Sequence, residues 1–246
     1  MDFALNFEKN LSDKEYTYKV SCDPREISSI TEILYQKAFE AARSDGLPYP
    51  VRIWNLIPFI NDFHGNLENY QAFCKGRKNV FDRFLPVESD YPAASAVGIF
   101  SNEISFRFLF SDTRPEIISN PFQVEAYRYP SIYGPTPPSF ARACLHKRSF
   151  YLSGTASIRG HETLYPDNLE QQLGLTLENI FIILEKANLS NKASNMNWKV
   201  FLKNRDDIMN VKAPIQDALG TNLAFVHADI CRSNLLIEIE GEYNGL

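Results

Sequence analysis

Two carboxylates lie two residues apart near the end of the chain, in the segment LLIEIE at residues 235–240. If this segment is a strand, alternation places Glu238 and Glu240 on one face and three aliphatic side chains on the other. The carboxylate face could simply meet water, as most glutamates do. Alternatively, a glutamate held on a rigid strand among apolar neighbours could have a raised pKa and serve as a general acid.

A cysteine precedes this strand. Cys231 stands seven residues before Glu238, next to Arg232, in the segment HADICRSN. A lone cysteine is compatible with two interpretations, an inert thiol in the core or a thiol with a function in a site.

A loop rich in tyrosine, glycine and proline, YPSIYGPTPPSFARA, occupies residues 129–143. Such a loop is stiff and would hold Tyr129, Tyr133 and Arg142 in fixed positions, although a purely structural turn would have the same composition. Arg142 falls in a predicted strand, where its guanidinium could bind a carboxylate of a ligand in bidentate fashion or form a surface salt bridge.

Small side chains fill the segment SGTASIRGH at residues 153–161. Gly154 and Thr155 would let a ligand approach the backbone closely, but the pattern is not that of a phosphate-binding loop. The four histidines are isolated in the sequence, and we expect structural roles for all of them: His64, His146, His161 and His227.

The elements that would position these residues are clearest in the last quarter of the chain. A strand at residues 198–203, a helix at 206–219 capped by Asn204, and strands at 222–228 and 235–240 form a βαββ unit. Pro214 weakens the helix prediction because a proline inside a helix removes a hydrogen bond.

Earlier segments repeat the order of strand, helix and strand. Apolar periodicity predicts the following elements: strand 15–21, helix 27–41, strand 51–57, helix 67–84, a strand pair 97–100 and 104–110 across a Ser-Asn-Glu turn, strands 122–129, 140–148 and 150–158, and a helix from Leu169. The apolar run at residues 180–184 fits a helix or a strand. We therefore expect an α+β fold of two related halves, each a sheet with helices on one face.

Composition limits the function. The 246 residues carry a formal net charge of −5, so no basic surplus favours a nucleic-acid partner. No apolar run has the length of a signal peptide or a membrane span, which predicts a cytoplasmic protein. The four cysteines are too scattered for a disulfide framework or a zinc site, so we expect free thiols and no metal.

Four blocks taken together resemble the chorismatase family: RIWNLIPFIN with NYQAFCKGR, YGPTPPSFARA, SGTASIRGH, and ADICRSNLLIEIEG. The resemblance covers the chain from about residue 30 onward. It implies two halves similar to the YjgF/RidA fold, which we place at residues 1–112 and 113–246. It also implies cleavage of the enolpyruvyl ether of chorismate without a metal or an organic cofactor.

The resemblance assigns roles to individual residues. Glu238 matches the family's catalytic carboxylate, which protonates the enolpyruvyl methylene. Arg142 matches an arginine expected to hold a substrate carboxylate, with Tyr133, Gly154 and Thr155 in the same binding region. Gly154 and Cys231 match the branch that forms 3-hydroxybenzoate, in which the cysteine assists aromatisation. The alternatives are 4-hydroxybenzoate or a mixture of isomers, a dihydroxycyclohexadiene carboxylate formed by hydrolysis, or an inactive RidA-like binding protein.

The sequence departs from the family pattern at two points. Lys203 stands where the family usually has an arginine, which replaces a bidentate fork by a point charge. The first half is also short, because only about 45 residues precede the RIWN block. A truncated sheet would expose an unpaired edge, so we expect an altered first half or a homo-oligomer.

Overall fold

The first half of the chain forms a mixed sheet with two helices. The computed structural model describes residues 9–10 and 13–245; residues 1–8, part of the segment searched for a signal peptide, lie outside this range. The elements of this half are β1 (Lys9–Asn10), β2 (Asp13–Ser21), α1 (Ile27–Ser44), β3 (Tyr49–Pro58), β4 (Phe63–His64), β5 (Leu67–Glu68), α2 (Asn69–Phe84), β6 (Ala93–Ile99) and β7 (Glu103–Ser111).

The second half repeats this pattern after a connection at residues 112–115. Its elements are β8 (Glu116–Ile118), β9 (Ala143–His146), β10 (Ser149–Thr155), β11 (Ile158–Arg159), β12 (Glu162–Thr163), α3 (Leu169–Lys186), β13 (Asn197–Leu202), α4 (Ile208–Leu219), β14 (Leu223–His227) and β15 (Ile237–Asn244). Its sheet has six strands, and the first sheet has five.

The two sheets share one strand order. The first sheet is arranged β1-β2-β7-β3-β6, and the second is arranged β9-β10-β15-β13-β14 with β8 added beside β9. The directions also agree, since β3 is parallel to β6 as β13 is to β14, and β7 and β15 are antiparallel to their neighbours. The first sheet therefore lacks no strand of the shared order. The expectation of a missing strand is not met, and the prediction of an oligomer loses that support.

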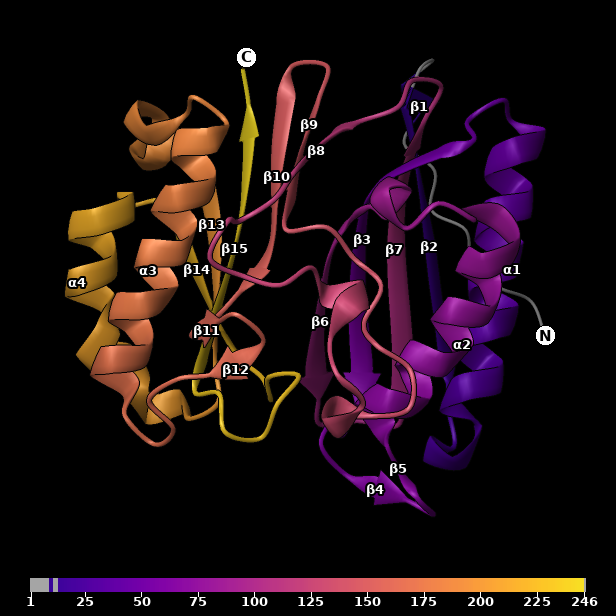
Figure 1. Cartoon of the computed structure of the whole chain (residues 1–246), viewed down its shortest axis with the longest axis horizontal. Helices are drawn as coiled ribbons and strands as arrows, with labels where there is room; N and C mark the ends of the chain where they lie inside the picture. Colours follow the sequence, from indigo (N-terminus) through magenta and orange to yellow (C-terminus); the bar gives the residue numbers. More distant parts are fainter. Residues whose placement is uncertain (1–8, 11–12, 246) are drawn as a thin grey trace.

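The halves pack sheet against sheet, with the helices outside, so four layers follow one another across the molecule (Figure 1). One apolar core lies between the first sheet and α1 and α2, and a second lies between the other sheet and α3 and α4. A smaller cluster that includes Val51, Trp54 and Cys144 joins the two sheets. The predicted α+β fold with helices on one face of each sheet is confirmed.

Several predicted elements differ in detail from the structure. β6 and β7 are not paired, because β3 lies between them. Residues 122–129 form no strand and include a short 3-10 helix, Ala126–Arg128. α4 begins at Ile208 after another short 3-10 helix, and Asn204 makes no capping hydrogen bond to the backbone. Residues 180–184 are helical and belong to α3.

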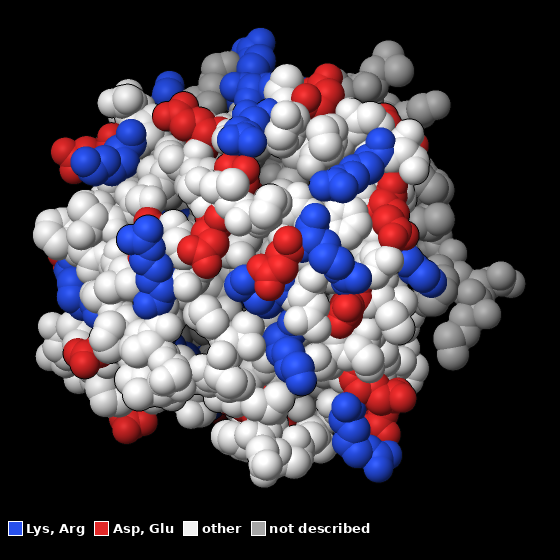
Figure 2. Space-filling model, turned by 45° about the vertical axis from the view of Figure 1, so that its right-hand side comes forward, with Lys and Arg blue, Asp and Glu red and all other residues white. Residues whose placement is uncertain are grey.

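The surface carries both signs of charge. On the face drawn in Figure 2, lysines and arginines lie among acidic residues, and neither sign of charge forms a continuous patch. Within the described part of the chain, no helix is long and apolar enough to cross a membrane. All four cysteines are free thiols, as predicted: Cys22, Cys74, Cys144 and Cys231.

Candidate active site

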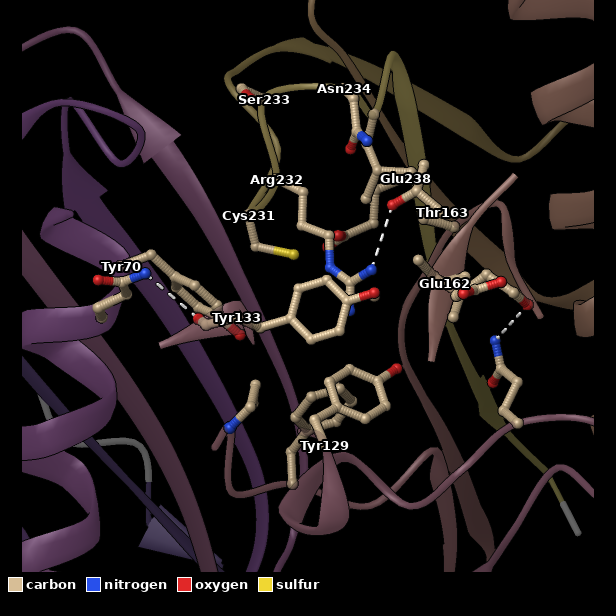
Figure 3. A pocket seen from close by; sticks show the side chains of 18 of the residues that line it. Tyr70, Tyr129, Tyr133, Glu162, Thr163, Cys231, Arg232, Ser233, Asn234 and Glu238 are labelled. Atoms are coloured by element: carbon tan, nitrogen blue, oxygen red, sulfur yellow. Dashed lines mark hydrogen bonds between the residues drawn. The ribbon is translucent and has the colours of Figure 1, made fainter. Parts of the chain in front are cut away.

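A cavity of about 520 Å³ opens between the two halves and contains most of the residues singled out from the sequence. The first turn of α2 forms one wall and the loop before β9 forms the second. The rest comes from β10, β15, the paired strands β11 and β12, and the loop between β14 and β15. Its principal polar and aromatic lining residues are Glu68, Tyr70, Tyr129, Tyr133, Arg142, Gly154, Glu162, Cys231, Arg232, Asn234 and Glu238. Figure 3 shows how side chains from these separate segments converge on one space.

Glu238 lies on β15, opposite Phe201 of β13. On its other side, the pairing of β10 with β15 is interrupted between Leu152 and Thr155 by a bulge. The bulge leaves Gly154 so close to the carboxylate that a Cβ atom there would overlap Glu238 Oε1. Bulges of this kind occur beside active sites because they redirect side chains and backbone. Here the glycine provides the room that the carboxyl group occupies.

The carboxyl group of Glu238 is buried and lacks an ion-pair partner among the described residues. Its side chain is 3% exposed, and its Oε1 atom has no hydrogen-bond partner among the described residues. Burial raises the pKa of Glu238 to about 8, and the nearby charge of Glu240 adds to this effect while Arg52 opposes it. Glu238 therefore keeps its proton at neutral pH, as a general acid requires.

Glu240 differs from Glu238 although it points to the same face. Its carboxylate pairs with the buried guanidinium of Arg52 on β3 at 2.8 Å and with the Lys199 ammonium at 2.9 Å. Burial alone would raise the pKa of Glu240, but these two cations hold it below its ordinary value. Both carboxylates are thus buried between the sheets, and the interpretation of this face as a solvent-facing one is wrong.

Two arginines face the cavity without a carboxylate partner among the described residues. Arg142 donates to the Val124 carbonyl at 2.7 Å and to the Tyr129 hydroxyl at 2.9 Å, and its Nε has no partner. Arg232 donates to the His161 carbonyl at 2.9 Å and lies 3.8 Å from the centre of the Tyr133 ring. Because their partners here are neutral, both cations are available to an anionic ligand.

Cys231 projects into the same cavity from the loop after β14 (Figure 3). Burial raises the pKa of its thiol, and the Glu238 charge raises it further, against a smaller opposing effect of Arg232. The group is therefore a neutral thiol at physiological pH. It can take part in hydrogen bonding and proton movement, but it is not an activated thiolate nucleophile.

Comparisons with known proteins agree with this geometry. Residues 11–110 match the family model described as Chorismatase FkbO/Hyg5-like, N-terminal. A 3-hydroxybenzoate synthase of Streptomyces hygroscopicus is 34% identical over 231 residues, which cover 86% of this chain and 68% of that protein. The chain belongs to the chorismatase family.

Two further proteins support membership of the chorismatase family. A chorismatase of Streptomyces hygroscopicus is 33% identical over 227 residues, covering 86% of this chain and 66% of its own length. A chorismatase crystal structure superposes with a TM-score of 0.90 and 29% identity, over 98% of this chain and 78% of that one. The chain thus spans about two thirds of the length of these curated chorismatases.

Most of the site residues predicted from the chorismatase resemblance meet in the cavity, and two do not line it. Tyr133, Arg142, Gly154, Cys231 and Glu238 contribute to its wall. Thr155 instead donates its hydroxyl to the Ser153 carbonyl, within the bulge. Lys203 donates to the Ser233 carbonyl at 2.5 Å, behind the loop that carries Cys231.

Sequence reasoning missed the contributions of α2 and of Arg232. Tyr70 lies in the block NYQAFCKGR, which contains several polar residues. The sequence of this block does not indicate which of them faces a ligand. Arg232 is adjacent to Cys231 in sequence, and this adjacency to a candidate site residue was the available signal. Among the described residues, no group of three histidine, cysteine, aspartate or glutamate side chains forms a potential metal site.

Proposed function

We propose that this protein converts chorismate to 3-hydroxybenzoate and pyruvate. The observation that carries the proposal is the buried carboxyl group of Glu238, whose pKa is raised by that burial, in a cavity whose wall also holds the cations of Arg142 and Arg232. Chorismate is a dicarboxylate with an acid-sensitive enol ether. An anion-binding pocket with one neutral acid matches both properties.

Glu238 supplies the proton in this reaction. Protonation of the enolpyruvyl methylene gives an oxocarbenium-like centre, and the ring–oxygen bond then breaks to release pyruvate. Arg142, with its unpartnered Nε, binds a substrate carboxylate, and Tyr133 forms the neighbouring wall beneath Arg232. Chorismate has the composition of hydroxybenzoate plus pyruvate, so the conversion needs no external oxidant.

Cys231 and Gly154 direct the outcome toward the aromatic acid. The neutral thiol of Cys231 assists proton movement while the ring intermediate opens, consistent with its raised pKa. Because Gly154 has no side chain, the carboxyl group of Glu238 can occupy its position, and an alanine at residue 154 would displace it. The matched relative named 3-hydroxybenzoate synthase supports this product.

The test is incubation of the purified protein with chorismate, without metals or nicotinamide, followed by a pyruvate assay and chromatography of the ring product. Pyruvate with 3-hydroxybenzoate is the expected result. Pyruvate with 4-hydroxybenzoate, with both isomers or with a non-aromatic acid would overturn the product assignment and keep the reaction class. No pyruvate would indicate a binding protein.

A further inference from the structure

A second, smaller cavity lies against the main one. Its volume is about 30 Å³, and Arg77, Ser95 and two alanines close it on the inner side. Five residues line both spaces: Tyr70, Phe140, Gly154, Cys231 and Glu238. A polar space of this size accommodates one ordered water molecule. We call it the inner chamber.

Two polar atoms of residues that line the inner chamber are buried without a partner among the described residues. They are Glu238 Oε1 and Arg77 Nε. The Arg77 side chain is 2% exposed and lies over the ring of Phe73, and it has no carboxylate partner in the described part of the chain. Buried polar groups are costly unless they are hydrogen-bonded, and ordered water commonly fills this role. An ordered water in the inner chamber would give such an atom a partner.

Tyr70 connects the two cavities. It lies seven residues before Arg77 on α2, so both side chains are on one face of the helix. Figure 3 shows Tyr70 approaching the site from the side of α2, across from Glu238. Burial raises the pKa of Tyr70 well above its ordinary value, with smaller contributions from neighbouring thiols that include Cys231. Its hydroxyl stays neutral and can both accept and donate a proton.

We propose that the inner chamber holds a water molecule that returns a proton to Glu238 after each turnover, and that Arg77 and Tyr70 are the residues that position it. This inference rests on the proposed function. Glu238 gives its proton to the methylene carbon, where the enol π electrons form the new C–H bond.

The remaining steps balance the transfer. The ring–oxygen bond breaks with its electron pair going to the oxygen of the departing pyruvate. The oxygen of the ring hydroxyl forms a bond to the carbon that pyruvate leaves and gives up its proton, which makes an arene-oxide-like intermediate. The bond between this oxygen and its original carbon then breaks and the oxygen takes back that proton. The carbon that now carries the oxygen loses its hydrogen as a proton, and the C–H electrons enter the ring. That proton reaches the Glu238 carboxylate through the water, so no proton is consumed overall.

The experiment compares the first turnover with later ones in Tyr70→Phe and Arg77→Lys. Glu238 is already protonated at the start, so the first pyruvate per enzyme does not need a returned proton, and its rate is the reference for the later turnovers of the same variant. Later turnovers should slow about tenfold, within the range of proton-transfer contributions, and imidazolium buffer should restore them. Tyr91→Phe is the matched control, because Tyr91 is a buried tyrosine that lines neither cavity, and both phases should stay unchanged.

An equal loss in both phases, or no loss in either, would overturn the proposal. Because Arg77 is buried, a second measurement uses the unaltered protein. A high-resolution crystal structure should contain a water in the inner chamber within roughly 2.7–3.2 Å of Glu238 Oε1, and a dry chamber would refute the inference. Failure of the unaltered protein to release pyruvate would instead refute the proposed function.

Discussion

Glu238 and Glu240 occupy the same face of one strand, two residues apart, and their chemistry is opposite. Glu240 meets Arg52 and Lys199 and stays ionised, whereas Glu238 meets the glycine of a bulge and an open cavity and stays protonated. Burial is nearly equal for both side chains, at 3% and 2% exposure. The partners, rather than the depth, therefore decide which carboxylate is an acid and which is a structural anion.

The ionised carboxylate also contributes to the acidity of the other one. The charge of Glu240 raises the pKa of Glu238, and Arg52 acts in the opposite direction on both. The ion pair of Glu240 and Arg52 thus influences the pKa of Glu238, although we assign neither residue a contact with the substrate. Substitutions at the two positions should separate these roles.

Glu238→Gln should have the largest effect on activity. It removes the proton and leaves the shape, so pyruvate release should fall roughly 10³-fold, while chorismate binding measured by calorimetry should persist. The free energy of unfolding should rise at pH 7, because the folded protein no longer buries a carboxyl group that prefers to ionise in the unfolded chain. Activity close to the unaltered level would exclude Glu238 as the acid.

Glu240→Gln should chiefly lower stability. It leaves the buried guanidinium of Arg52 without its carboxylate, and breaking a buried pair from one side costs about 3 kcal/mol. Urea unfolding measures the change. Glu242→Gln is the control on the same strand, because the Glu242 carboxylate is partly exposed and lies 3.9 Å from Arg107. Equal stability losses for the two variants would contradict the distinction drawn here.

Gly154→Ala should displace the Glu238 carboxyl group, since the added Cβ would overlap Oε1. A shift of about 1 Å in a catalytic group reduces rates roughly 10²-fold, and the ring product should move toward the non-aromatic acid. Chromatography with the pyruvate assay measures both changes. Gly174→Ala on α3 has open space around the new methyl group and should leave activity unchanged.

A change of pH should have the smallest effect of these tests near neutrality. Activity should be constant near neutrality and fall about tenfold per pH unit above the Glu238 pKa of about 8, as the acid loses its proton.

The free energy of unfolding should also depend on pH through Glu238. The folded protein keeps the Glu238 proton up to about pH 8, whereas the unfolded chain releases it near the ordinary pKa of 4.5, so stability falls as pH rises between these values. A pH-independent unfolding free energy over this range in the unaltered protein, together with the same result for Glu238→Gln, would argue against a raised pKa.

The alternation in residues 235–240 predicted correctly that both glutamates share a face. It could not predict that the face is buried, because Arg52 is 188 residues away from Glu240 along the chain. Likewise, the strand order that places β3 between β6 and β7 is a property of the assembled sheet, and local periodicity suggested a simple hairpin. Tyr133 and Arg142 were identified from their loop. Their relation to Arg232 depends on contacts between loops far apart in sequence.

The repeated strand order has a consequence for symmetry. β7 and β15 are equivalent strands of the two sheets, yet Arg107 of β7 faces Glu242 of β15. In a twofold assembly of identical subunits, each side chain would enter the interface twice, and a change that helped one side would be imposed on the other. Two unlike halves in a single polypeptide avoid this constraint. Opposite charges can face each other across the junction, and one half can hold the acid without a duplicate in its counterpart.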